Sequence, residues 1–179
     1  MIDPLLQLVI AVALALLFAS AAMHKRSEPA RFRAQLAAYG LLPADLVRPA
    51  AATLPWLELG IALLLVPAAT RGATGAVAAI LLSAYAGGIA VNLLRGRADI
   101  DCGCGGTAQP LSWSLVLRNL ALASAAALLL APAGDRAMLI TDALWLALLV
   151  PLLVIAYAAL GEILRNAALL RPGNSSRGH

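Results

Sequence analysis

The sequence predicts an all-α integral membrane protein, a bundle of about five transmembrane helices with a short amphipathic helix in the membrane interface. Two observations support this class. Of the 179 residues, 62% are hydrophobic and 12% are charged, whereas a soluble domain has roughly 45–50% and about 25%. In addition, five windows hold the roughly 20 mostly apolar residues that a helix needs to cross a bilayer. We expect residues 1–170 to form one membrane-embedded domain, followed by a basic flexible tail at 171–179.

The five apolar windows are separated by short polar segments. No basic segment precedes the first window, and no small-residue cleavage site follows it, so we expect a retained helix rather than a signal peptide. The second window contains prolines, which a membrane helix tolerates because neighbouring groups satisfy the freed backbone. The expected spans are Leu5–Met23, Pro49–Ala69, Ala73–Leu94, Ser112–Ala131 and Met138–Leu160.

Small residues recur at every fourth position in the third window. A face of small residues lets another helix pack closely. The sequence therefore predicts a close helix contact along this face, which consists of Gly75, Ala79, Ser83 and Gly87.

The polar segment between the first two windows contains the pattern of an interfacial helix. Ser27 suits a helix cap, Pro29 suits the first turn, and Gly40 suits the end. Apolar residues spaced i, i+4 and i+7 share one face, as in helices that lie in the membrane surface. The alternative is a polar loop with a few apolar residues. The apolar face would hold Phe32, Leu36 and Tyr39, and the other faces Arg31, Arg33 and Gln35.

The basic residues predict the orientation of the bundle. With five spans, eleven of the 13 lysines and arginines fall on one side of the membrane. Because basic residues are retained in the cytoplasm, we expect the N-terminus outside and the C-terminus inside a bacterial-type inner membrane. The cysteine-bearing loop would also be cytoplasmic. The eleven are Lys25, Arg26, Arg31, Arg33, Arg48, Arg95, Arg97, Arg118, Arg165, Arg171 and Arg177, against Arg71 and Arg136.

Both cysteines of the chain, Cys102 and Cys104, lie in the glycine-rich polar stretch ADIDCGCGGTAQP at residues 98–110. A disulfide across one residue departs from relaxed disulfide geometry, and a strained, exposed disulfide is more oxidising and labile. Such a small ring restricts little chain entropy, so it is a poor structural staple. We therefore interpret the cysteines as a redox pair for thiol–disulfide exchange.

Two other interpretations of the cysteines remain. In the first interpretation the cysteines are incidental loop residues, and in the second they bind a metal ion. A closed metal site needs four ligands, and the only histidines are His24 and His179, so no metal is predicted. A nearby arginine such as Arg118 would lower a thiol pKa, whereas Asp99 and Asp101 would raise it. The sequence leaves that balance open.

Glu58 lies in the middle of the second window. A carboxylate there is costly, so it should face the bundle interior and be paired or protonated. One interpretation is a proton-coupled or redox-coupled site near the thiols, and the other is a paired glutamate that fixes helix register. Arg118 is the candidate partner, unless it tunes the thiols or snorkels to the membrane surface. Asp142 is expected at a helix start.

Four segments, in their order and spacing, resemble one known family. They are FASAAMHKRSEPARFRAQLAAYGLLP, LPWLELGIALLL, NLLRGRADIDCGCGG and LVLRNLALA. Together they are similar to the MauE family of membrane proteins, which is related to DoxX-like helical bundles. The resemblance covers roughly residues 10–130, and the C-G-C loop is its most specific element. In one departure, Gly105 stands where the family is expected to have an aromatic residue, and this change would alter partner docking or thiol exposure.

The resemblance implies an accessory role in methylamine utilisation. MauE-like proteins are thought to help mature the periplasmic methylamine dehydrogenase, whose small subunit is rich in disulfides. The implied partners are the lipid bilayer, a thioredoxin-like protein and an exported disulfide-bearing client. No nucleic-acid partner is expected, since aromatic residues make up 4% of the chain.

The implied periplasmic role conflicts with the charge count, which places the cysteines in the cytoplasm. A relay across the membrane would need a mobile loop or a quinone-like intermediary, although no residue points to a quinone and no cofactor is predicted. The alternative function is a non-redox membrane scaffold or a small transporter subunit of DoxX-like type. In that case Glu58, and not the cysteines, would matter.

Overall fold

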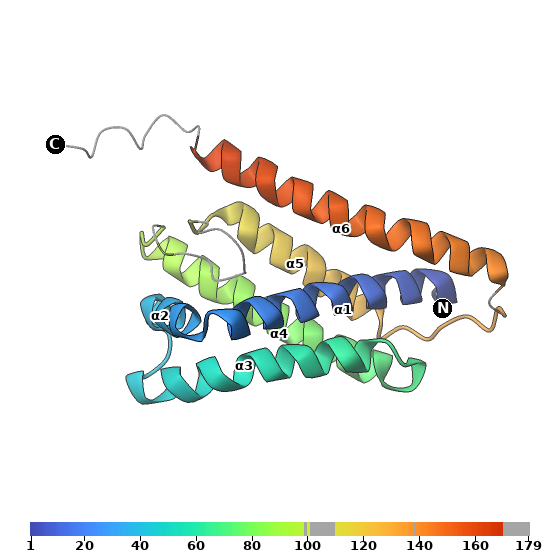
Figure 1. The fold of residues 1–179 in the computed structure, drawn as a ribbon, viewed down its shortest axis with the longest axis horizontal. Coiled ribbons are helices and arrows are strands. Elements are labelled where there is room, and N and C mark those ends of the chain that lie inside the picture. The colour runs from blue at the N-terminus through green and yellow to red at the C-terminus, as the bar shows by residue number, and fades with distance from the viewer. Residues whose placement is uncertain (99, 101–109, 138, 170–179) are drawn as a thin grey trace.

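A computed structural model describes residues 1–98, 100, 110–137 and 139–169 of the chain. The described part consists of helices joined by short connections, so the all-α class is confirmed. Most of the helices lie alongside one another, and successive long helices run in opposite directions (Figure 1). The helices are α1 (Pro4–Ser27), α2 (Pro29–Tyr39), α3 (Ala44–Leu65), α4 (Ala68–Leu94), α5 (Trp113–Leu128) and α6 (Ile140–Leu169).

Helices α1, α3, α4 and α5 form the body of the bundle. Helix α1 packs most extensively against α3, and α4 against α5, while α3 also contacts α4. Their apolar faces meet in one core, which explains why these four segments fold together. The buried core residues include Leu14 and Phe18 of α1, Leu65 of α3, Leu82 of α4 and Ala126 of α5.

In the described part of the chain, four helices are long and apolar enough to cross a membrane, namely α1, α3, α4 and α6 up to Ile163. The fourth expected span is shorter than predicted, because α5 has 16 residues and ends at Leu128. The boundary between the second and third spans also differs from the prediction. Helix α4 begins at Ala68 directly after Pro67, and the Arg71 side chain donates to the Val66 carbonyl at 2.8 Å. This arginine thereby satisfies a carbonyl at the end of α3.

The predicted close contact along the small-residue face of α4 is found only near the start of the helix. A side chain at Gly75 would come within 2.8 Å of Leu129 Cβ, so α4 needs glycine there. Ser83 and Gly87 are instead exposed. A repeat of four residues drifts around a helix of 3.6 residues per turn. The buried face of α4 therefore follows a mixed spacing, through Gly75, Ala78, Leu82, Ala86 and Ile89.

The predicted amphipathic helix is α2, and Figure 1 shows it nearly end-on, across the direction of the long helices. Phe32 is buried, and Arg31 and Arg33 are exposed. Gly40 ends the helix with a φ of 60°, a conformation that glycine adopts without strain. The expected capping role of Ser27 is wrong, because this residue ends α1 and its hydroxyl donates to the His24 carbonyl.

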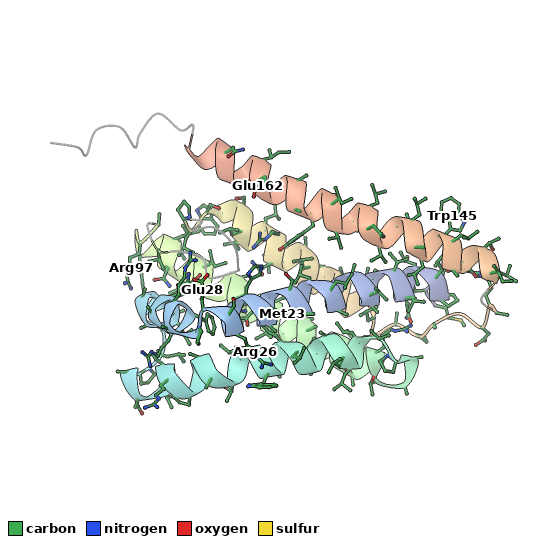
Figure 2. All side chains as sticks on the ribbon, in the orientation of Figure 1. Met23, Arg26, Glu28, Arg97, Trp145 and Glu162 are labelled. Atoms are coloured by element: carbon green, nitrogen blue, oxygen red, sulfur yellow. The ribbon has the colours of Figure 1, made fainter. Side chains whose placement is uncertain are left out.

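Helix α6 lies on the outside of the body and packs mainly on α1. Most of its apolar side chains are exposed, and Trp145 projects away from the other helices (Figure 2). An apolar helix with so little protein contact is typical of a membrane span that faces lipid. The described helices thus form a multi-pass membrane protein.

Candidate functional site

A buried ionic centre joins three helices of the body. Glu58 of α3 is 0% exposed, and its Oε1 atom forms an ion pair with Lys25 Nζ of α1. The Tyr85 hydroxyl of α4 donates to the same oxygen at 2.7 Å. The expectation that Glu58 is buried and paired is met by these contacts. The centre connects segments that lie 33 and 27 residues away from Glu58 in the sequence.

Aromatic rings surround the Lys25 ammonium group. Its Nζ atom lies 5.1 Å from the centroid of the Tyr85 ring and 5.3 Å from that of Phe32. Cations within about 6 Å of a ring centroid are attracted by the ring quadrupole. Phe32 comes from α2, so the interfacial helix covers the ionic centre. The ammonium is therefore held by one carboxylate and two ring faces in place of water.

The second carboxylate oxygen of Glu58 is a buried acceptor. Within the described residues, Glu58 Oε2 has no hydrogen-bond partner. Buried polar atoms without partners are uncommon in native proteins and call for an explanation. The centre thus keeps one acceptor that can take a proton or a polar group, besides its role in joining helices.

Arg118 does not pair with Glu58, so that expectation is wrong. Its guanidinium carbon lies 5.4 Å from the centroid of the Tyr157 ring of α6. Its Nε atom is buried and, in the part of the chain that the structure covers, has no hydrogen-bond partner. The physical reason is the direction of the side chain, because Arg118 contacts α6 whereas Glu58 contacts α1 and α4.

The predicted redox pair, Cys102 and Cys104, lies outside the described residues, but the roots of its loop are described. Helix α4 ends at Leu94. Gly96, two residues later, has a φ of 73°, and the Arg97 amide donates to the Asn92 carbonyl at 2.9 Å. Arg97 also donates through its side chain to the Ala38 carbonyl of α2 at 2.9 Å. The Leu111 amide donates to the Ala98 carbonyl at 3.0 Å. The two roots are therefore tied together beside α2.

Sequence reasoning missed Lys25, Tyr85 and Phe32 as members of the ionic centre. The sequence pattern identifies Lys25 only as one of the charges that orient the bundle, and Tyr85 only as part of an apolar window. One available signal is that a glutamate in an apolar span requires a nearby cation. The lysine that directly follows the preceding span is a natural candidate, but which helix faces reach each other is decided by packing.

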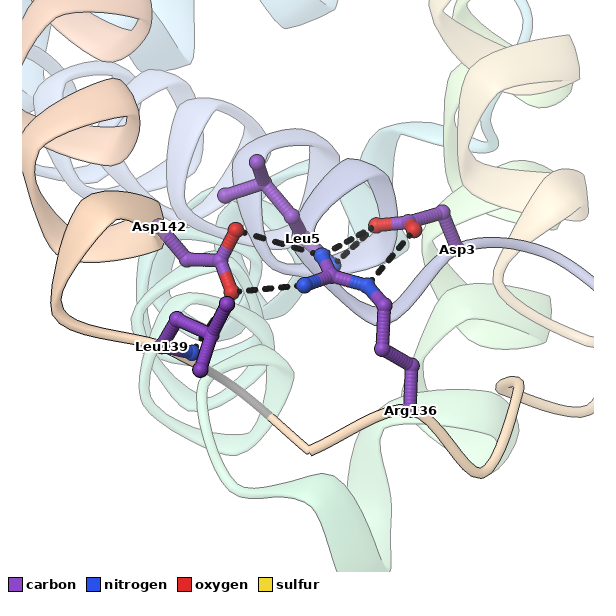
Figure 3. Close-up of polar contacts among 5 residues, drawn as sticks. All are labelled: Asp3, Leu5, Arg136, Leu139 and Asp142. Carbon is purple, nitrogen blue, oxygen red and sulfur yellow. Dashed lines mark hydrogen bonds and ion pairs between the residues drawn. The ribbon is translucent and has the colours of Figure 1, made fainter.

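A second ionic cluster lies at the opposite end of the bundle, shown in Figure 3. Arg136 donates to both oxygens of Asp3, at 3.1 and 3.2 Å, and to both oxygens of Asp142, at 2.9 and 3.2 Å. Asp142 lies in the first turn of α6, as predicted, and accepts from the Leu139 amide. Hydrogen bonds from Arg136 lower the pKa of the Asp3 carboxyl. This cluster ties the start of α1 to the start of α6.

Comparison with known proteins gives one consistent result. The sequence profile of the family described as methylamine utilisation protein MauE matches residues 3–132. A methylamine utilization protein MauE from Paracoccus denitrificans is 39% identical over 128 residues, which are 70% of this chain and 69% of that protein. The MauE protein of Methylorubrum extorquens is 42% identical over 126 residues, 69% of this chain and 68% of that protein.

A longer match extends further along the chain. The MauE protein of Paracoccus versutus is 40% identical over 149 residues, 79% of this chain and 80% of that protein. No solved structure matches the chain. The profile match holds the ionic centre and the cysteine loop, and α6 follows it.

Proposed function

The chain belongs to the MauE family of methylamine utilisation proteins, and from this premise we propose that it carries out thiol–disulfide exchange through Cys102 and Cys104. The observation that carries the proposal is the placement of the chain's two cysteines. They occupy one C-x-C sequence, in a loop whose roots are tied beside α2 by the Leu111–Ala98 hydrogen bond. The described ends of this segment, Ala98 and Leu111, are thus held where α4 ends and α5 begins (Figure 1). We expect a soluble partner to reach the cysteine pair from this end of the bundle.

The exchange takes place in two balanced steps. A dithiol of a thioredoxin-like partner attacks the Cys102–Cys104 disulfide, passes through a mixed disulfide, and is released as a disulfide. The pair gains two electrons and two protons. Its two thiols then reduce an incorrect disulfide of the client to two thiols, and the pair returns to the Cys102–Cys104 disulfide. The client is an exported, disulfide-bearing protein, and the family points to methylamine dehydrogenase.

Serine variants test this proposal. In cells that grow on methylamine, we expect Cys102→Ser, Cys104→Ser and the double variant to lower the yield of correctly disulfide-bonded client. Each single variant should also trap a mixed disulfide with the client, because the remaining thiol can attack a client disulfide but no second thiol is present to resolve the product. Non-reducing electrophoresis detects this species. Ser83→Ala, at an exposed position of α4, is the control for the presence of the protein in the membrane. Normal client yield in the double cysteine variant would exclude thiol exchange as the function.

Orientation in a bacterial inner membrane is a second part of the proposal. The ends of α1, α4 and α6 and the starts of α3 and α5 lie at one end of the bundle (Figure 1). Of the described basic side chains, only Arg71 and Arg136 belong to the other end. The positive-inside rule then puts the cysteine loop in the cytoplasm, so that electron transfer to an exported client would require the loop to move or a quinone-like intermediary to cross the membrane. A membrane-impermeant thiol reagent should label the pair only in permeabilised cells. Labelling in intact cells would indicate the opposite orientation.

The ionic centre favours one alternative function, a non-redox scaffold or transporter subunit of DoxX-like type. A buried carboxylate with a free acceptor suits proton or solute coupling without any role for the thiols. Glu58→Gln separates the two functions, provided that the variant accumulates normally. Loss of function in Glu58→Gln together with full function in the double cysteine variant would favour the alternative. The reverse result would favour thiol exchange.

A further inference from the structure

An apolar groove lies between α2 and the first turns of α3. Its floor consists of Ala30, Ala34 and Ala37 of α2 and of Ala44 and Val47 of α3. The alanines are exposed, and Val47 is buried beneath them. Small side chains on both helices therefore leave a shallow apolar channel, and the helices themselves are in direct contact.

Two arginines flank this floor. Arg33 of α2 and Arg48 of α3 line the groove, and both are exposed. Across the part of the chain that the structure describes, neither guanidinium group takes part in a hydrogen bond or an ion pair. Asp45 lies one turn before Arg48 but does not pair with it. The groove thus combines an apolar floor with two guanidinium groups that keep their donors for a ligand.

The position of the groove relative to the membrane follows from the sequence of α3. Its first residues, Ala44–Arg48, include Asp45 and Arg48 and are too polar for the hydrocarbon core, whereas the apolar part of the helix follows them. The groove is lined by these first residues. It therefore lies at the polar end of α3, at the level of the headgroups.

We propose that the groove between α2 and α3 binds the headgroup and glycerol region of an anionic phospholipid. Arg33 and Arg48 bind the phosphate, because guanidinium groups match phosphate oxygens in charge and geometry. The alanine floor contacts the apolar part that begins at the glycerol. A free phosphate ion would use the arginines but not the floor, so the apolar lining favours a lipid. Occupation of the groove would fasten α2, and with it Phe32, over the ionic centre.

The experiment uses the full chain in phosphatidylcholine nanodiscs or in neutral detergent, titrated with phosphatidylglycerol. Bound lipid is counted by native mass spectrometry, and the midpoint of thermal unfolding is followed in parallel. We expect phosphatidylglycerol to bind more tightly than phosphatidylcholine and to raise the midpoint. Arg33→Gln and Arg48→Gln should each weaken this binding roughly fivefold, the effect of one basic residue at an anionic surface.

Matched variants separate a built site from diffuse charge. Arg95→Gln removes one exposed positive charge at the same end of the bundle but outside the groove, and should leave binding unchanged. Ala37→Leu fills the groove and should weaken binding, whereas Ala38→Leu, on the same helix but outside the lining, should not. Thermal unfolding in phosphatidylcholine alone verifies that each variant is folded.

Three results would overturn the proposal. The first is equal loss of binding in Arg95→Gln and Arg48→Gln, which would indicate only the surface potential. The second is an equal rise of the midpoint with inorganic phosphate, which would indicate a site for a free anion. The third is unchanged binding in the folded Ala37→Leu variant. If Ala37→Leu does not fold, the arginine variants and the phosphate titration still decide between these outcomes.

Discussion

Both ends of the bundle join helices through ion pairs, but water reaches the two clusters very differently. Lys25 and Glu58 are 8% and 0% exposed, whereas the side chains of Arg136 and Asp3 are 40% and 49% exposed. The two clusters contain the same kinds of groups. Burial removes the solvent that would otherwise stabilise a separated charge. Both partners of the inner pair are buried, whereas in the outer cluster Asp142 is buried but Arg136 and Asp3 remain open to water.

The clusters also differ in how completely their atoms are satisfied. All four carboxylate oxygens around Arg136 accept hydrogen bonds from it. Every acceptor in this cluster is therefore satisfied, as expected of a cluster that only joins two helices. In the ionic centre, Glu58 Oε1 accepts two donors, while Oε2 is buried without a partner in the described ranges. An ion pair that only joins helices would not need a buried carboxylate oxygen without a donor. This oxygen marks the inner cluster, and not the outer one, as the candidate functional site.

The largest expected effect comes from breaking the buried pair on one side. Glu58→Leu leaves the Lys25 ammonium buried without its counter-charge, and Lys25→Met leaves the Glu58 carboxylate with only the Tyr85 hydroxyl. Each single variant should lower the free energy of unfolding by about 3–5 kcal/mol. Chemical denaturation in detergent, followed by circular dichroism, measures this change.

The double variant Lys25→Met with Glu58→Leu sharpens the same comparison. It removes both charges, so it should recover a large part of the stability that either single variant loses. Glu28→Leu is the control, because Glu28 pairs with Arg31 while its side chain is 60% exposed. That control should change stability little. Equal losses in Glu28→Leu and Glu58→Leu would mean that burial does not set the effect.

A smaller effect is expected from removing the tyrosine hydroxyl. Tyr85→Phe deletes the 2.7 Å hydrogen bond to Glu58 Oε1 but keeps the ring near Lys25. A hydrogen bond to a charged group contributes about 1.5–3 kcal/mol, and the same denaturation measures this loss. Tyr157→Phe is the matched control, because the ring of Tyr157 contacts Arg118 and would be retained. If both variants behave alike, the Tyr85 hydroxyl does not support the centre.

Much of the fold could be predicted because the bilayer imposes strong rules on sequence. Apolar windows located the long helices, and the pattern around Phe32 located α2. Helix ends were less predictable, since Ala44–Arg48 is too polar for a span but continues the same helix. A hydropathy window locates the apolar part of a helix, but it misses polar helical turns that extend the helix beyond that part.

The candidate site was only half predictable, for a physical reason. The cost of a buried charge singles out Glu58 from composition alone. Its partner depends on which helix faces meet, and that was decided by packing of α1 on α3 in favour of Lys25 over Arg118. The roles of Cys102 and Cys104 remain predictions from the sequence.

At the outer cluster, Arg136→Gln should lower the unfolding midpoint less than Tyr85→Phe does. Water can replace the hydrogen bonds that the exposed Asp3 loses, and the buried Asp142 carboxylate keeps its hydrogen bond from the Leu139 amide. The contribution of the cluster should also fall as salt rises, because exposed charges are screened. Thermal unfolding at low and high salt tests both statements. A loss of stability in Arg136→Gln as large as that in Glu58→Leu would mean that the two clusters do not differ in how much they stabilise the fold.

The smallest effect, and the one with a defined pH dependence, concerns Asp3. Hydrogen bonds from Arg136 hold the pKa of its carboxyl below the ordinary value of 3.8. A group whose pKa is lower in the folded state stabilises the fold above its ordinary pKa, and this contribution is lost as the pH falls through the lower value. The pKa of Arg136 is raised by Asp142 and Asp3, so the arginine stays charged throughout.

Asp3→Asn isolates the effect of the charge. The Leu5 amide donates to Asp3 Oδ1 at 2.9 Å, and an asparagine at this position still offers an oxygen for that hydrogen bond. Wild type should be slightly more stable than Asp3→Asn near neutral pH, and the difference in unfolding midpoint should vanish in acid, once the pH has fallen below the lowered pKa of Asp3. Asp45→Asn, at an exposed carboxylate, is the control. A difference that persists in acid, where both side chains are uncharged, would mean that Asp3→Asn acts through something other than the lost charge. The contrast between the two ends of the bundle would then no longer rest on how burial changes the strength of an ion pair.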